Sequence, residues 1–236
     1  MSTKKYELTE EFRVTETGEM VYRIRATEDI PSQGVKKGDL GGFMGNNAIL
    51  SDDTWVFDDA QVSGQAQVSG SARVSDSGWV SDSAWVSGQA QISGSAWISG
   101  QARVSGAARV FGQAQISDSA RISGQTQVFG LAWVSDAARI SGYAQVYGQA
   151  RVFDSARVFG NAHVFDHAQV SDSAQVSGSA QVSGRTQVFD RAWVFENPEI
   201  SDNVVVRDDA KIFGDVRLFG DMVISGNTQV HDDALD

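Results

Sequence analysis

The sequence has no cysteine, two prolines and only three histidines among its 236 residues. Without cysteine, the chain forms no disulfide, zinc–thiolate site or thiol nucleophile, so packing and hydrogen bonding must stabilise it. No apolar run approaches the roughly eighteen residues of a membrane-spanning helix, so we expect no membrane segment, no signal-peptide core and a cytoplasmic protein. Basic residues are also scarce: 19 Lys and Arg against 30 Asp and Glu give a net charge of -11, which argues against general nucleic-acid binding.

What the sequence has in abundance is a six-residue repeat. From Ala48 to Asp236 the chain can be written in about thirty rows of six without an insertion, as in residues 60–65 (AQVSGQ) and 102–107 (ARVSGA). The third position of each row is Val, Ile or Leu, the fifth is Gly, Asp or Glu, and the first is nearly always Ala. A fixed short period of this kind is typical of a hexapeptide parallel β-helix.

The alternation within each row explains the choice of residues. Positions one and three share a face of a short strand and point into the tube, whereas positions two and four point to solvent. Position five forms the corner, where Gly and Asp adopt a positive φ at the lowest cost. Three rows close one coil, and the strict period favours the left-handed triangular form. The predicted fold class is therefore all-β, a left-handed parallel β-helix of about ten coils over residues 48–236.

Residues 1–47 break the repeat and form a separate predicted domain. Residues 12–25 alternate in the manner of a β-hairpin, with Thr17 and Gly18 near its turn. We expect an N-terminal hairpin cap that covers the open end of the β-helix. Residues 196–236 instead carry ten acidic and three basic residues, a charge that we expect to discourage end-to-end stacking.

Three segments carry a resemblance to a known family: Tyr22–Ala26 (YRIRA), Val35–Gly42 (VKKGDLGG) and the serial rows of the ARVFG type. With them the chain resembles hexapeptide-repeat proteins of bacteria and prophages that are classed with the acyltransferases. The resemblance implies a left-handed β-helix and, more loosely, an acyl-CoA-dependent enzyme. Such enzymes are trimers that work between subunits, with a catalytic histidine and a loop that leaves the coils. In this chain His163 would be the base, and acetyl-CoA or another acyl-CoA the cofactor.

Side chains three rows apart stack on one another if three rows form a coil. One such column is basic and consists of Arg103, Arg121, Arg139 and Arg157. Guanidinium groups ~4.8 Å apart can each form two hydrogen bonds to a carboxylate or phosphate, which makes the column a candidate anion site. Alternatively Asp118, Asp136 and Asp154, each three residues before an arginine, neutralise the column as surface ion pairs. The aspartates at that corner replace glycine for backbone reasons, so we expect no metal site.

Another column is aromatic and consists of Phe111, Phe129, Tyr147 and Phe165. A tryptophan patch adds Trp79, Trp97 and Trp133. Two apolar patches on a polar surface favour an interface, either in a homo-oligomer (a dimer or trimer) or with a protein partner. The alternative is a ladder of stacked rings that only stabilises the coils.

The histidines are the test for catalysis. His163 and His167 lie in one row near the aromatic column, and His163 is a candidate general base if a neighbouring subunit packs there. The sequence shows no nucleophile triad, phosphate-binding glycine loop or metal-ligand spacing, and its unbroken rows lack the loop of the acyltransferases. It therefore predicts a non-catalytic interaction or scaffold protein of bacterial or prophage origin that needs no cofactor, with an acyltransferase as the alternative.

Overall fold

Within residues 4–232 nearly all regular secondary structure is β-strand, in short strands joined by turns. The structure, a computed structural model, describes residues 4–232, which contain strands β1–β34 and one 3-10 helix, η1 (Pro31–Gln33). Two compact units, both built from the same coil, meet in the chain between Asp118 and Ser119. The ends of the predicted cap and β-helix ranges, with the acidic residues Asp233 and Asp236, lie outside the described residues. No helix within residues 4–232 has the length and apolarity needed to cross a membrane.

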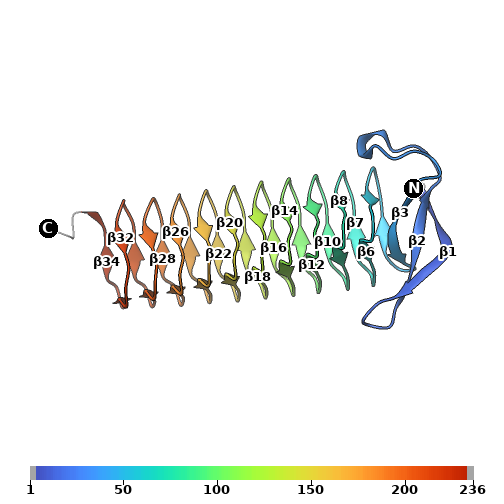
Figure 1. The fold of residues 1–236 in the computed structure, drawn as a ribbon. Coiled ribbons are helices and arrows are strands. Elements are labelled where there is room, and N and C mark those ends of the chain that lie inside the picture. The colour runs from blue at the N-terminus through green and yellow to red at the C-terminus, as the bar shows by residue number, and fades with distance from the viewer. Residues whose placement is uncertain (1–3, 233–236) are drawn as a thin grey trace. The chain divides into compact units, whose positions relative to one another are not determined.

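The N-terminal strands form the expected antiparallel cap. Strand β1 (Tyr6–Val14) pairs with β2 (Met20–Ala26), and Gly18 with φ 82° lies in the turn between them. A third strand, β3 (Leu40–Gly45), was not predicted: it is antiparallel to β2 on one side and parallel to β6 (Gln61–Val62) on the other. Strand β3 therefore joins the cap to the coils (Figure 1).

The coils of the first unit contribute strands to three sheets, which we name faces 1, 2 and 3. Each two-residue strand pairs in parallel with the strand one coil away. Face 1 continues β3 and β6 with β9 (Trp79–Val80), β12 (Trp97–Ile98) and β15 (Gln115–Ile116). Face 2 holds β4 (Ile49–Leu50), β7 (Gln67–Val68), β10 (Trp85–Val86) and β13 (Arg103–Val104). Face 3 holds β5 (Trp55–Val56), β8 (Arg73–Val74), β11 (Gln91–Ile92) and β14 (Arg109–Val110).

The coils of the second unit follow the same order, and we give the corresponding sheets the same names. Face 1 holds β18 (Trp133–Val134), β21 (Arg151–Val152), β24 (Gln169–Val170), β27 (Gln187–Val188), β30 (Val205–Val206) and β33 (Val223–Ile224). Face 2 holds β16 (Arg121–Ile122), β19 (Arg139–Ile140), β22 (Arg157–Val158), β25 (Gln175–Val176), β28 (Trp193–Val194), β31 (Lys211–Ile212) and β34 (Gln229–Val230). Face 3 holds β17 (Gln127–Val128), β20 (Gln145–Val146), β23 (His163–Val164), β26 (Gln181–Val182), β29 (Glu199–Ile200) and β32 (Arg217–Leu218).

The core consists of positions one and three, as the alternation predicts. Ala138 and Ile140 are both 0% exposed, whereas Arg139 between them is exposed. Small alanines alternate with β-branched residues, which favour strands and fill the narrow tube. The parallel β-solenoid of about ten coils predicted from the period is confirmed.

Backbone hydrogen bonds between coils form a regular ladder. In one row, Arg139 N–H donates to Ala156 O (2.9 Å), Ser141 N–H to Val158 O (3.0 Å) and Tyr143 N–H to Gly160 O (2.8 Å). Corners close by a bond within the chain, such as that from Ala138 N–H to Ser135 O (3.2 Å). The fifth residue of the row has positive φ, for example 58° at Asp136 and 74° at Gly142, which confirms the predicted corner.

The glycines of the VKKGDLGG segment let the cap approach the first coil closely. A Cβ added to Gly41 would lie 2.6 Å from Val56 O and 2.8 Å from Ile24 Cγ1, and one on Gly42 would meet the carbonyl of Ala60. No side chain fits there without a shift of the backbone. Trp55, only 1% exposed, packs beneath the cap because of this approach.

Candidate functional site

The aromatic column on face 3 of the second unit is a stack of parallel rings. The centroids of Phe129 and Tyr147 lie 4.8 Å apart and those of Tyr147 and Phe165 lie 5.0 Å apart, each pair with planes only 4° apart. The rings are half-buried because they cover one another's faces, so mainly their edges meet solvent. Burial raises the pKa of Tyr147, and the charge of Asp166 adds to this effect. Phe111 occupies the equivalent place in the first unit.

Several tryptophans on the faces are anchored by hydrogen bonds to serine. Trp79 and Trp97 of face 1 stack with centroids 5.2 Å apart, and each indole donates to a serine of the preceding coil. This contact recurs in four places: Trp79–Ser63, Trp85–Ser69, Trp97–Ser81 and Trp193–Ser177. Trp133, in the second unit, lies 5.4 Å from the guanidinium carbon of Arg151 and is 42% exposed. The predicted patch is thus divided between the units, and the indole N–H groups of Trp79 and Trp97 already have acceptors.

The arginines of the predicted basic column fall into two groups. In the first unit, Arg103 lies over Trp85, with its guanidinium carbon 5.6 Å from the ring centroid. In the second unit, Arg121, Arg139 and Arg157 follow one another in register on face 2. Within residues 119–232 no ion pair joins these three to Asp136 or Asp154. The predicted neutralising pairs at those positions are therefore wrong.

The corner aspartates have a different role, which explains why they do not reach the arginines. Asp154 accepts the backbone N–H of Asp172 (3.3 Å), and Asp190 accepts that of Asp208 (3.0 Å), always one coil further on. The corner N–H group has no acceptor in the backbone ladder, so a carboxylate at the same corner supplies one. Among the described residues, no group of three or more His, Asp or Glu side chains is arranged to hold a metal ion.

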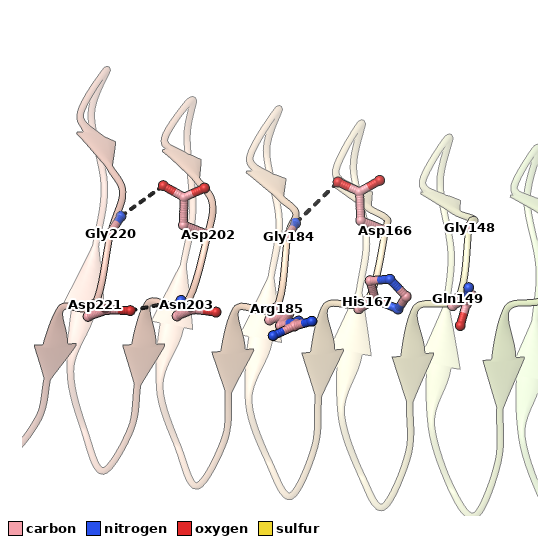
Figure 2. A pocket seen from close by; sticks show the side chains of 10 residues that line it. All are labelled: Gly148, Gln149, Asp166, His167, Gly184, Arg185, Asp202, Asn203, Gly220 and Asp221. Carbon is pink, nitrogen blue, oxygen red and sulfur yellow. Dashed lines mark hydrogen bonds between the residues drawn. The ribbon is translucent and has the colours of Figure 1, made fainter.

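His163 and His167 lie on the outside of face 3 and at its following corner. His163 meets Tyr147 edge to face, with ring centroids 6.3 Å apart. His167 lines an open hollow of about 660 Å³ along the corner (Figure 2). There Asp166 and Asp202 accept the N–H groups of glycines, and Asn203 donates to Asp221 (2.8 Å). Neither imidazole has a hydrogen-bonded carboxylate among residues 4–232 to orient it as a base, and the hollow does not exclude water.

Comparison with known proteins supports the same architecture. Two segments, residues 66–82 and 144–160, match the family model described as the YdcK beta solenoid repeat. Each segment spans about one coil, one in each unit. The chain is a β-solenoid repeat protein. The matched description names a repeat and no activity, and no curated protein matches the chain.

One aromatic cluster of this solenoid was missed by the sequence analysis. On face 2 of the second unit, the ring centroids of Trp193 and Phe195 lie 4.4 Å apart. The ring of Phe195 also stacks on that of Phe213, with centroids 5.0 Å apart. His231 continues the stack at 4.9 Å, so the third histidine belongs to a ring column. The signal was present in the three-row period, because residues 195, 213 and 231 all occupy position four.

Proposed function

We propose that the protein is a non-catalytic β-solenoid that self-associates through face 3 of its second unit. The observation that carries this proposal is a pair of exposed apolar side chains at the two corners of that face. Leu131 is 54% exposed and Tyr143 is 58% exposed, on either side of the ring edges of Phe129 and Tyr147. Isolated exposed apolar residues are common, but several gathered on one otherwise polar face favour an interface.

The expected affinity is modest. Full burial of the three aromatic rings on this face, at about 150 to 250 Å² each and ~25 cal/mol per Å², would contribute roughly 10 to 20 kcal/mol. Here the stack already buries the ring faces, so association gains less than this from the rings and depends on the corner residues. Association costs about 4 to 15 kcal/mol, and a weak dimer or trimer is the result we expect.

Light scattering at tens of micromolar concentration tests self-association. We expect a mass above that of one chain for the wild type, and a single-chain mass for the double variant Leu131→Ser, Tyr143→Ser with its thermal stability unchanged. The variant Phe129→Ser, Tyr147→Ser should lose both association and stability, because these rings also stack. A wild type of single-chain mass would refute the proposal and leave the rings as a stabilising ladder.

The acyltransferase alternative rests on His163 and on an acyl-CoA that a neighbouring subunit would help to bind. Calorimetric titration with acetyl-CoA tests it directly. We expect no binding, and we expect His163→Ala and His167→Ala to leave folding and association unchanged. Acetyl transfer that disappears in His163→Ala would establish the alternative.

A further inference from the structure

Face 2 of the second unit presents three arginines at a fixed spacing. Arg121, Arg139 and Arg157 are Cα partners in neighbouring strands β16, β19 and β22, and all three are exposed. Strands paired in this way hold equivalent side chains ~4.8 Å apart. The three guanidinium groups therefore form a straight row on a rigid backbone.

These arginines lack partners that other arginines of the same unit have. Arg191 pairs with Asp209 at 2.7 Å, and Arg217 pairs with Glu199 at 3.1 Å, each one coil away. In contrast, the side chains of Arg121, Arg139 and Arg157 make no hydrogen bond or ion pair within residues 119–232. In a chain with net charge -11, carboxylates are plentiful, yet within residues 119–232 none forms an ion pair with this row. Three neighbouring like charges repel one another, so a bound anion would stabilise the row.

A hollow lies beside two of the arginines. Its volume is about 300 Å³, and it is lined by Arg139, Ser141, Arg157, Phe159 and Gln175. Position four changes here from serine in one coil to phenylalanine in the next, which leaves a step in the surface. The hydroxyl of Ser141 and the amide of Gln175 offer neutral donors, and the half-buried ring of Phe159 forms an apolar wall.

We propose that this row and hollow bind a multivalent anion whose phosphoryl or carboxylate groups bridge neighbouring guanidiniums. Arginine's planar fork matches both groups with two parallel hydrogen bonds, and the spacing of the row favours a ligand with several charges over a single ion. An apolar or ring portion of the ligand lies against Phe159. The site is independent of face 3, and its binding does not require self-association.

Calorimetric titration with inorganic tripolyphosphate at low salt tests the site, and a second titration with the tricarboxylate tricarballylate distinguishes phosphoryl from carboxylate ligands. We expect the wild type to bind at least one of them, with affinity that falls as salt rises. Arg139→Gln should weaken binding by about tenfold or more, because it removes a charge-assisted pair of hydrogen bonds from the centre of the row. Arg139→Lys should weaken it as well, because a lysine lacks the fork.

Arg151→Gln is the matched control. It removes the same charge from position two of a coil in the same unit, but on face 1 beside Trp133. We expect its affinity within about twofold of the wild type, since exposed charges on another face are screened. Equal losses in Arg139→Gln and Arg151→Gln would show a general charge effect and overturn the proposal. Absence of binding by the wild type to both probes would overturn it too.

The apolar wall is tested with phenyl phosphate against inorganic phosphate. The wild type should prefer phenyl phosphate, and Phe159→Ser should lose this preference while retaining its melting temperature. Serine is the residue at the same position in the coils on both sides, at Ser141 and Ser177, so the variant should fold. An unchanged preference in Phe159→Ser would contradict the role of the ring.

Discussion

At the scale of single residues, the position in the row decides what a side chain does. Position three favours apolar side chains, because it lies inside the tube, where Ile140 is 0% exposed. Position five needs a positive φ, which Gly supplies freely and Asp supplies with a carboxylate that accepts an N–H of the next coil. Asp is therefore more than a substitute for Gly at a corner.

A charge at position three should unfold the coil locally. Ile140 is 0% exposed, so Ile140→Asp would bury an unpaired carboxylate and lower the free energy of unfolding by several kcal/mol. Urea denaturation measures this loss. Tyr143→Asp, in the same row but 58% exposed, should change stability by less than about 0.5 kcal/mol. Similar losses in both variants would show that the assigned register is wrong.

A second residue-scale prediction concerns threonine at position one. Thr186 is fully buried and its hydroxyl has no partner among the described residues, whereas the hydroxyl of Thr54 donates to Ser51 O at 2.9 Å. Thr186→Val keeps the shape and removes the unpaired hydroxyl, so we expect the free energy of unfolding to rise by about 1 to 2 kcal/mol. Val204 occupies the same position one coil further. Thr54→Val should give no gain, and a loss in Thr186→Val would contradict the assignment.

At the scale of elements, the cap is held by specific contacts with the first coils. The guanidinium carbons of Arg13 and Arg23 lie 4.1 and 4.5 Å from the centroid of the Phe43 ring. Glu19, which precedes β2, accepts the N–H of Gly64 at 2.7 Å and so takes the role that aspartate has at later corners. No aspartate lies one coil before Gly64 at this corner, so the cap supplies the acceptor for its N–H group.

One ion pair of the cap should make its stability depend on pH. Hydrogen bonds from Lys5 (2.9 Å) and Ser32 (3.0 Å) hold the pKa of Asp53 below its usual 3.8, and the bond to Asp53 raises the pKa of Lys5 above 10.5. The depressed carboxyl pKa stabilises the fold above pH 3.8 and loses this effect as pH falls through the folded pKa. The raised amine pKa stabilises it below pH 10.5 and loses this effect as pH rises through its folded value.

Thermal melting of Asp53→Asn against the wild type measures this contribution. The variant should melt at a lower temperature throughout the range from pH 3.8 to pH 10.5, and the difference should shrink outside it. Glu10→Gln, an exposed carboxylate of the same cap, should melt as the wild type does. A difference that persists at strongly acid pH would mean that packing, not charge, holds the cap.

At the scale of the whole molecule, the sequence predicts the repeating part of the fold well and the side-chain partners poorly. The period alone places Ile140 in the core and Gly142 at a corner, because every coil repeats the same backbone. It does not predict that the indole of Trp97 donates to Ser81, or that Asp154 accepts a backbone N–H and forms no ion pair with Arg157. These partners depend on side-chain rotamers. Nor does a local pattern show that β3 pairs with both the cap and the coils.

Removal of one whole coil should leave a folded protein. Paired residues of neighbouring coils are 18 positions apart, so deletion of residues 144–161 brings equivalent residues into register again. Circular dichroism should show a retained β signal and cooperative melting. Deletion of residues 144–152, half a coil, places corner residues opposite strands and should abolish folding. Equal damage in both deletions would contradict a strictly repeating ladder.

Because every row repeats the same backbone, a change in the number of rows affects the core and the surface differently. Loss of a single row within the second unit would leave the core intact, because every row presents the same small and aliphatic residues to the tube. Each later side chain would nevertheless move to the next face, so that Phe165 would join the file of Ser141 and leave that of Tyr147. An insertion or deletion of one row can therefore preserve the packed core while moving every later surface side chain to a different face.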